Sequence, residues 1–356
     1  MSEGVVYRFP CPGVGVALMA VYTDSPQFAA AFLPPEVAGG FVPPDGLDPE
    51  VRPLLQEVFG GPGNLFSSPG SDLPFPHLLL SEFSPGSQYD HLIRLARRDP
   101  GVPDGVVCLA GSGSGFHGFK GRSWAAIPGN LHLAVHLAPN REIERFGVAF
   151  TILAALSVVD ALTQIAGLEG GARIKWVNDI LLGDAKVAGI LAYTQSQGAT
   201  VTSAVLGIGV NVESIPVVEP TPFVPRVSSV RDFLPAGGPD LRETALHNLM
   251  WALGENYQTL LRDGISPLLE RYRENSMVVG EDVTICTDAS NQALQVLAEG
   301  RVLGLGENLE LMLEGRAEPI RGGRLVLGKG VPEIQARATG TGEHGLAPMV
   351  ATNVES

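Results

Sequence analysis

The spacing of apolar residues divides the chain into a turn-rich beginning and a more regular remainder. Ten prolines fall between Pro34 and Pro76. Proline removes a backbone donor and resists helix interiors, so long elements are not expected there. We therefore predict a segment of unknown role over residues 1–77, with short helices only at residues 25–32 and 49–59.

Beyond that segment, strand and helix patterns follow one another. Residues 130–137 alternate apolar and polar positions, which predicts a strand with one buried face. His132 and His136 share its less apolar side, where we expect polar surface or pocket-edge residues. Residues 142–165 repeat apolar positions at helical spacing, which predicts a long helix. The other predicted strands are residues 78–80, 105–110, 172–176, 179–182, 187–194 and 200–210, and the other predicted helices are residues 89–98, 241–262 and 265–275.

This succession predicts the α+β class, because strands and helices do not alternate strictly as they do in doubly wound folds. We expect residues 78–276 to form one domain, a mixed or antiparallel sheet backed by helices. Residues 277–330 contain short apolar runs separated by glycines, which predicts a small β-barrel. Residues 331–356 are polar and rich in Gly and Thr, so we expect a flexible tail.

Composition narrows the class of protein. Hydrophobic residues make up 45% of the chain and charged residues 17%, which is typical of a globular protein with a sizeable core. The formal net charge of −14 argues against nucleic acid as a partner, since phosphate contacts supply most of that affinity. No signal peptide and no uncharged apolar run of transmembrane length is evident, so we expect no membrane contact.

The cysteines favour a reducing, cytoplasmic location. The chain has three of them, Cys11, Cys108 and Cys286, which are far apart and form no CxxC pair. A disulfide framework or a zinc cluster is therefore not expected.

A glycine-rich loop over residues 111–124 carries the first candidate chemistry. Glycines let backbone N–H groups approach an anion closely, and Lys120 and Arg122 add positive charge. The loop is neither a P-loop nor a dinucleotide fingerprint, because the required spacing and the following helix are missing. A phosphate-binding loop and an ordinary surface turn both remain open on composition alone.

Two further segments carry lysines and glycines in strand patterns. Lys175 and Lys186 flank a predicted hairpin that also contains Asp179, so a cation and a carboxylate could share one pocket. An exposed hairpin with surface lysines is the alternative. Gly207 and Gly209 lie in a predicted strand, where glycine marks the close approach of a ligand or another backbone.

Taken together, these segments resemble the biotin protein ligase family in order and spacing. That family shows a Gly-Arg-Gly-Arg-x-Gly-Arg-x-Trp loop, a Pro-x-Gly-x-Asn-Leu strand entry, and Lys-Trp-Pro-Asn-Asp, Lys-x-x-Gly-Ile-Leu and Gly-x-Gly-Ile-Asn segments. The resemblance covers about residues 78–328. The matching segments are Lys120-Gly-Arg-Ser-Trp124, Pro128-Gly-Asn-Leu131, Lys175-Trp-Val-Asn-Asp179, Lys186-Val-Ala-Gly-Ile-Leu191 and Gly207-Ile-Gly-Val-Asn211.

The resemblance implies a fold and a two-step reaction. The expected fold is a class II biotin/lipoate ligase-like mixed sheet backed by helices, followed by an SH3-like barrel. A carboxylic acid, biotin in the first place, would react with ATP and magnesium to give an acyl-adenylate and pyrophosphate. A lysine of a biotinyl or lipoyl carrier domain would then attack the acyl carbon. A homodimer is possible.

The resemblance also implies roles for individual residues. Lys186 would contact the carboxylate and the α-phosphate, and Asp179 would lie near magnesium and the acceptor lysine. The other residues implied in ligand or nucleotide binding are Gly115, His117, Lys120, Gly121, Arg122, Trp124, Gly129, Asn130, Lys175, Asn178, Gly189, Gly207, Gly209 and Asn211.

Several positions depart from the family pattern. His117 and Phe119 replace the first two arginines of the loop, and Tyr193 replaces a glutamate. An upstream Ser/Thr-Asn motif is only loosely matched by residues 84–88. Losing guanidinium groups should weaken the hold on an acyl-adenylate by about 1.5–3 kcal/mol per hydrogen bond. A lipoate or octanoate ligase or transferase, and a non-catalytic ligand-binding relative, therefore remain alternatives to a biotin ligase.

Overall fold

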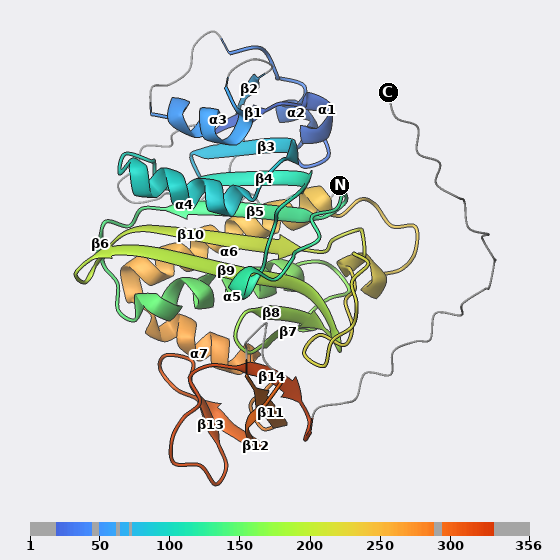
Figure 1. Cartoon of the computed structure of the whole chain (residues 1–356). Helices are drawn as coiled ribbons and strands as arrows, with labels where there is room; N and C mark the ends of the chain where they lie inside the picture. The colour runs from blue at the N-terminus through green and yellow to red at the C-terminus, as the bar shows by residue number, and fades with distance from the viewer. Residues whose placement is uncertain (1–18, 45–49, 62–64, 71–72, 288–293, 331–356) are drawn as a thin grey trace, which may run out of the picture.

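One mixed sheet of ten strands organises the computed structural model, which describes residues 19–44, 50–61, 65–70, 73–287 and 294–330 (Figure 1). The strand order is β2-β1-β3-β4-β5-β10-β9-β8-β7, and β6 pairs with β10. β3 runs parallel to β1 and to β4, and the other pairs are antiparallel. The strands are β1 (Ala20–Thr23), β2 (Phe66–Pro69), β3 (His77–Ser84), β4 (Val106–Gly113), β5 (Leu131–Leu137), β6 (Arg141–Glu142), β7 (Ala172–Lys175), β8 (Asp179–Leu182), β9 (Ala185–Gln197) and β10 (Thr200–Val210).

Helices cover both faces of this sheet, which confirms the predicted fold class. α5 packs on β7 to β10 from one face and contacts α6 and α7 on its outer side. α4 packs on β5 and β10 from the opposite face, next to α3. The helices are α1 (Pro26–Ala29), α2 (Pro35–Ala38), α3 (Arg52–Phe59), α4 (Gln88–Arg98), α5 (Phe146–Thr163), α6 (Arg242–Asp263) and α7 (Ser266–Asn275), with 3-10 turns η1 (Phe119–Gly121) and η2 (Val230–Phe233).

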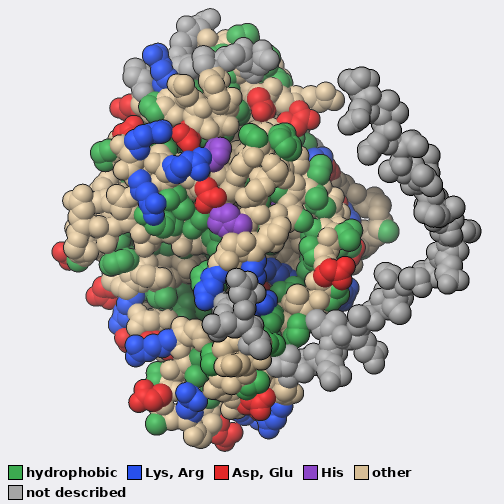
Figure 2. Space-filling view, in the orientation of Figure 1, with side chains coloured by type: hydrophobic (Ala, Val, Ile, Leu, Met, Phe, Trp, Pro, Cys, Tyr) green, Lys and Arg blue, Asp and Glu red, His purple; other side chains and the backbone are tan. Residues whose placement is uncertain are grey.

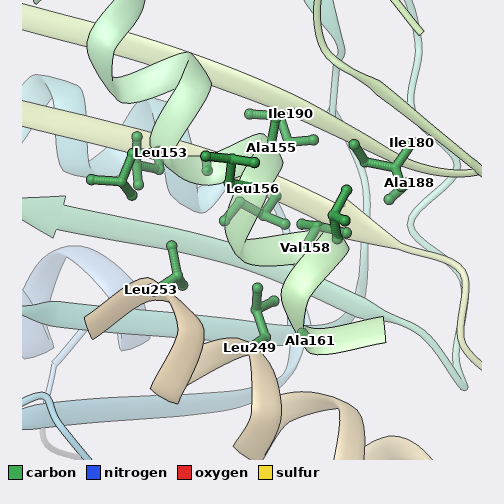
Figure 3. Packing of buried hydrophobic residues seen from close by; sticks show 14 of the residues in the cluster. Leu153, Ala155, Leu156, Val158, Ala161, Ile180, Ala188, Ile190, Leu249 and Leu253 are labelled. Atoms are coloured by element: carbon green, nitrogen blue, oxygen red, sulfur yellow. The ribbon is translucent and has the colours of Figure 1, made fainter. Parts of the chain in front are cut away.

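The main core lies between the sheet and α6, with α5 at its centre. Leu153 and Leu156 of α5 are fully buried, and Leu249 and Leu253 of α6 face them across the helix pair (Figure 3). α5 is long and apolar enough to cross a membrane, with a mean hydropathy of 2.0 over 18 residues, but 67% of that stretch is buried. A helix enclosed by a sheet and by other helices acquires this composition because it is apolar all round.

Pairing between strands explains why the boundaries of the long helix and of β4 differ from the sequence-based prediction. The long helix begins at Phe146 and not at residue 142, because Arg141 and Glu142 pair with β10 as β6. Arg145 then has a φ of 50°, a left-handed conformation that cannot continue a helix. β4 extends to Gly113, inside the predicted loop, because its end pairs with β3.

The described part of the N-terminal segment adds two strands to the main sheet. β1 pairs with β3, and β2 forms the outer edge beside β1. The short helices predicted at residues 25–32 and 49–59 correspond to α1 and α3 over narrower ranges. The division of the chain into four domains and the role of residues 1–77 remain predictions.

A second, smaller antiparallel sheet lies beside α7 and the β7–β8 hairpin (Figure 1). It follows residue 277, where the short strands were predicted, and its strand order is β13-β12-β11-β14. Trp176 ties the two sheets together, because its Nε1 donates to the carbonyl of Leu309 at 2.7 Å. The predicted flexible tail, residues 331–356, lies outside the described residues. The strands are β11 (Asp282–Cys286), β12 (Val296–Leu305), β13 (Leu311–Leu313) and β14 (Arg324–Leu327).

Charges of both signs are mixed over the face that bears α4 (Figure 2). Arg94 and Arg98 of α4 both pair with Glu57 of α3, at 3.3 and 3.1 Å. This part of the surface therefore presents no uniform basic field.

Candidate active site

A cavity of about 230 Å³ lies on the face of the sheet that bears α4. Its floor follows one row of directly paired residues across neighbouring strands. Gly209 of β10 pairs with His132 of β5 on one side and with Gly189 of β9 on the other, and Gly189 pairs with Asp179 of β8. Directly paired residues point to the same face of a sheet. The two glycines therefore leave a trough between an imidazole and a carboxylate.

The indole of Trp124 lies in this trough. A Cβ atom at Gly209 would come within 2.3 Å of Trp124 Cζ2, and one at Gly189 within 3.2 Å of Cζ3. The indole Nε1 donates to Nδ1 of His132 at 3.2 Å. Both glycines are thus explained by the close approach of an aromatic ring to the strands.

An ion pair forms the charged end of the cavity. Lys186 Nζ lies 2.6 Å from Asp179 Oδ1, and both side chains are about one-fifth exposed. The ammonium group also lies 5.8 Å from the Trp124 ring. A cation that is only partly solvated is well placed to meet the carboxylate or phosphate of a ligand.

Lys175 lies behind this end, at the next position of the same row. It pairs with Asp179, is buried, and donates from Nζ to the carbonyl of Phe223. Burial lowers the pKa of Lys175 to about 8, against the attraction of Asp179, and the neighbouring cations Lys186 and Arg324 lower it further. Lys175 is not among the residues that line the cavity, and its ammonium group binds the carbonyl of Phe223, whose neighbour Val224 lines it.

The opposite end of the cavity is formed by the first turn of α4. Ser87, Gln88 and Tyr89 all line it. Gln88 is 1% exposed, and neither its Oε1 nor its Nε2 has a hydrogen-bond partner in the protein. A buried polar group left unpaired costs about 1–3 kcal/mol. This amide is therefore suited to a ligand group that offers both a donor and an acceptor.

The glycine-rich loop closes the cavity from above. His117 Nε2 lies 3.0 Å from Asp90 Oδ2, which ties the loop to α4. Phe119 is 48% exposed at the cavity mouth. Lys120 has a φ of 56° and Gly121 a φ of 73°, so the chain reverses sharply there. At the positions of the first two arginines of the family pattern, the loop thus has an imidazole in contact with Asp90 and an aromatic ring.

Most of the predicted site residues line this one cavity. Gly115 and Gly121 line instead a second hollow formed by the same loop, and Lys120 lies in η1 between the lining residues Phe119 and Arg122. The predicted residues that line the cavity are His117, Arg122, Trp124, Asn178, Asp179, Lys186, Gly189, Gly207, Gly209 and Asn211.

Gly129 and Asn130 lie outside the lining and support it. Asn130 is fully buried, its Oδ1 accepts from the N–H groups of Val212 and Ser214, and its Nδ2 donates to the carbonyl of Ser214. The amide is therefore occupied with the backbone that follows Asn211. Gly129 is needed beside it, because a Cβ there would meet Ser214 Oγ at 2.4 Å.

Several residues that line the cavity were not among the predicted site residues. Gln88 and Tyr89 belong to or adjoin the segment that matched the family only loosely. His132 was expected as a polar surface or pocket-edge residue, and it is a buried residue of the cavity wall. Arg324 comes from β14 of the small sheet, and its guanidinium lies 3.6 Å from the centroid of the Phe223 ring. Nothing in the sequence around Arg324 indicates this placement, which results from the packing of the two sheets. His136 is buried and not a surface residue, with Ser203 and the Pro103 carbonyl as partners.

Comparison with known proteins defines first the class of fold. The biotin protein ligase of Aquifex aeolicus, solved in complex with biotin and ATP, superimposes with a TM-score of 0.55 over 71% of this chain and 99% of that chain. The two sequences are 21% identical, so this likeness concerns the fold alone. The fold is that of a biotin protein ligase, with the mixed sheet, its helices and the small antiparallel sheet.

The sequence comparisons point to the same family. Residues 94–211, about a third of the chain, match the model of the Biotin/lipoate A/B protein ligase family. The bifunctional ligase/repressor BirA of Bacillus subtilis is 26% identical over 216 residues, which cover 60% of this chain. The biotin–[acetyl-CoA-carboxylase] ligase of Paracoccus denitrificans is 34% identical over 117 residues, 33% of this chain. The matches span 62% and 48% of those relatives, less than two thirds of their length.

Proposed function

We propose that this protein activates biotin with ATP and transfers it to a lysine of a carrier protein. The observation that carries the proposal is one cavity with chemically distinct ends. Lys186 and Asp179 form the charged end, and the unpaired amide of Gln88 lies at the other. A solved protein of the same fold binds biotin and ATP. A relative is named as a ligase of biotin to acetyl-CoA carboxylase.

Gln88 supports biotin over lipoate or octanoate. The ureido ring of biotin offers N–H donors and a carbonyl acceptor, which match the two unpaired atoms of a buried primary amide. A dithiolane or an alkyl tail offers neither and would leave both atoms of Gln88 unpaired. The expected penalty is about 1–3 kcal/mol for each unpaired group.

The first step requires positive charge beside the reacting phosphate. A carboxylate oxygen of the acid attacks the α-phosphorus of ATP, a P–O bond forms, and the bond to the departing pyrophosphate breaks. Lys186 would release Asp179 and contact the carboxylate and the developing charge on phosphorus. We assign Arg122, Asn178 and Asn211 to the nucleotide, because all three line the cavity and come from three separate segments of the chain.

Magnesium fits this chain as a companion of ATP. Mg²⁺ is typically held by one or two carboxylates together with substrate phosphates. Asp179 is a carboxylate of the cavity wall that could supply one ligand, and Glu219 is another. Among the described residues no group of three or more acidic, His or Cys side chains forms a metal cage, which agrees with a metal that arrives with its substrate.

The second step transfers the acyl group. The carrier lysine attacks the acyl carbon, the C–N bond forms, AMP leaves with its phosphate oxygen, and the attacking amine loses a proton. Asp179 is placed to receive that proton once Lys186 has turned to the phosphate. The acceptor would be a biotinyl carrier domain, or a lipoyl domain under the alternative below. We further propose a cytoplasmic protein, with a homodimer as its possible assembly.

A lipoate or octanoate ligase is the second candidate, and the loop favours it. Phe116 and Phe119 line the cavity. The family pattern has a glycine at the position of Phe116 and an arginine at the position of Phe119. Two aromatic rings would cover an alkyl chain well. The loop also lacks two guanidinium groups of the family pattern. A relative that binds the ligand without catalysing the reaction is therefore an alternative, and the experiment below includes it as an outcome.

The test measures binding and pyrophosphate release together. Biotin, lipoate and octanoate are titrated by calorimetry with and without ATP and magnesium, and pyrophosphate release is followed for each acid. Lys186→Ala should lower release by about 100-fold or more, the usual loss when one charge-stabilising group is removed. Lys329→Ala is the control, because Lys329 is an exposed lysine paired with Asp282 at 3.6 Å, outside the cavity.

Gln88→Leu identifies the acid. It should weaken biotin binding about tenfold and leave octanoate binding equal or stronger, because only biotin uses the amide. Pyrophosphate release that depends on both biotin and Lys186 would establish the proposed biotin ligase activity. Release with octanoate or lipoate alone moves the assignment to the second candidate, and tight binding without release from any acid points to a binding protein.

A further inference from the structure

His132 is a buried group in the cavity wall that belongs to none of the family-like segments. It is 2% exposed and lies in the same row as Gly209. Its Nδ1 is 3.2 Å from Trp124 Nε1, and its Nε2 is 3.0 Å from the carbonyl of Ile127. The proposed reaction assigns it no part.

The two hydrogen bonds fix the state of the imidazole. An indole N–H only donates, so Nδ1 of His132 must accept, and a carbonyl only accepts, so Nε2 must carry the proton. His132 is therefore neutral, with a single tautomer. Burial lowers the pKa of His132 to about 4, against the hydrogen bond to Ile127, so the ring keeps this state at neutral pH.

His132 contacts both ends of the loop over the cavity. The ring of Phe116 lies edge-on against it, with centroids 5.8 Å apart, and Trp124 is bonded to it. The backbone closes the same loop, because Trp124 N donates to the Phe116 carbonyl at 3.0 Å. One imidazole on the sheet thus holds the beginning and the end of the segment that carries His117, Phe119 and Arg122.

We propose that neutral His132 is a positioning residue, which seats the Trp124 indole in the glycine trough and so forms the cavity before any ligand binds. The indole meets Gly189 and Gly209 and lies beside Lys186, so its seat determines the shape of the charged end. His132 acts through Trp124 and does not take part in the chemistry. Its effect on substrate rests on the proposed function, but the seating of the indole does not.

Two substitutions separate the two hydrogen bonds. His132→Asn places an amide oxygen near the position of Nδ1 and keeps the acceptor for Trp124. His132→Gln places an amide nitrogen near the position of Nε2, keeps the bond to Ile127 and loses the acceptor for Trp124. Trp124→Phe keeps an aromatic ring in the trough and removes the donor.

The first measurement uses the ligand-free protein. The chain has three tryptophans, so the signal of Trp124 is the difference between each protein and its Trp124→Phe counterpart. Loss of one hydrogen bond should shift the equilibrium between seated and displaced indole about fivefold. Acrylamide quenching of Trp124 should therefore increase in His132→Gln and stay at the wild-type level in His132→Asn.

The second measurement is the affinity for biotin with ATP and the rate of pyrophosphate release. His132→Gln should raise KM about fivefold with little change in kcat, and His132→Asn should resemble the wild type. In the Trp124→Phe background His132→Gln should add no further loss, since the bond it removes is already gone.

Equal quenching in all three proteins, or additive losses of His132→Gln and Trp124→Phe, would overturn the positioning role. A wild-type protein that binds none of the acids would refute the proposed function, and the quenching result would still decide the role of His132. A purely structural role for His132 predicts equal damage from His132→Asn and His132→Gln, which thermal unfolding of both variants would reveal.

Discussion

The two faces of three neighbouring strands, β5, β10 and β9, differ in side-chain volume and in polarity. On the α5 face Ile208 of β10 pairs with Leu133 of β5 and Ile190 of β9, and all three side chains are buried. One residue further along each strand, the opposite face carries the row of His132, Gly209 and Gly189. A step of one residue thus separates a close-packed apolar row from a trough with a titratable group.

The comparison shows where stability and chemistry are located. The α5 face buries branched apolar side chains, whose removal from water and close packing stabilise the fold. The α4 face gives up side-chain volume at its glycines and leaves polar atoms of Gln88 and Asn211 without protein partners. Natural proteins break local rules of packing and pairing at functional sites. Between these two faces, the contrast therefore supports a ligand on the α4 face.

The largest expected effect comes from the apolar row. Ile208→Ala should lower the free energy of unfolding by about 2–5 kcal/mol, because it removes buried methyl groups and leaves a cavity. Urea unfolding measures the loss. Ile215→Ala is the control, since Ile215 is 45% exposed and should change stability by less than about 0.5 kcal/mol. If Ile208→Ala abolished ligand binding in the folded fraction and left stability unchanged, the division between the two faces would be wrong.

Much of the α5 face could be predicted from the sequence. Alternating apolar residues at 130–137 predicted β5, which spans Leu131–Leu137. The prediction that only one face of this strand is buried was wrong, because α4 packs on β5 and all seven residues are buried. The pattern is informative because a strand with one buried face has a period of two, and any shift would expose its apolar side chains. The start of α5 was placed four residues too early, because Glu142 fits a first helical turn by type and only its pairing with β10 shows otherwise.

The α4 face was predictable only in part. The glycines of β10 stand out in any strand, and the lysine segments matched a known family pattern. The hydrogen bond between Trp124 and His132 requires the indole to lie against Gly209. No local sequence pattern indicates that contact. Arg324 reaches the cavity through packing between two sheets, over a sequence separation that local patterns do not bridge.

The second prediction uses the titratable member of the glycine row. The native pKa of His132 is about 4, below the ordinary value of 6.5, so between these values the unfolded chain binds a proton that the native protein does not. Stability should therefore fall as pH drops from 6.5 towards 4, by about 3 kcal/mol from this group. His132→Asn should not show that part of the loss, and urea unfolding at pH 7 and pH 4 compares the two proteins. His136 is present in both the wild type and His132→Asn, so its contribution to the pH dependence is the same in the two proteins. A pH-independent difference between them would contradict the assignment.

A third prediction makes the α4 face more like the α5 face. Gln88→Leu replaces an unpaired buried amide with an apolar side chain of similar size, so it should stabilise the ligand-free protein by about 2 kcal/mol. Thermal unfolding without ligand should show the gain, and saturating biotin should reduce or reverse it, since only the wild type gains the ligand's hydrogen bonds. A loss of stability in the ligand-free variant would mean that Gln88 has partners within the protein.

The smallest expected effect tests the trough itself. Gly209→Ala places a methyl group where Trp124 Cζ2 lies 2.3 Å away, so the indole must move and its bond to His132 must weaken. At Gly189 the nearest ring atom is 3.2 Å away, and a shift of a few tenths of an ångström suffices. Loss of a hydrogen bond worth about 1 kcal/mol predicts a roughly fivefold weaker affinity for Gly209→Ala and a smaller change for Gly189→Ala. Both residues are in extended strands, so neither alanine strains the backbone. The free energy of unfolding should therefore change little in either protein. Calorimetric titration with the bound acid compares them, and equal affinities would show that the trough does not need the indole at the position seen here.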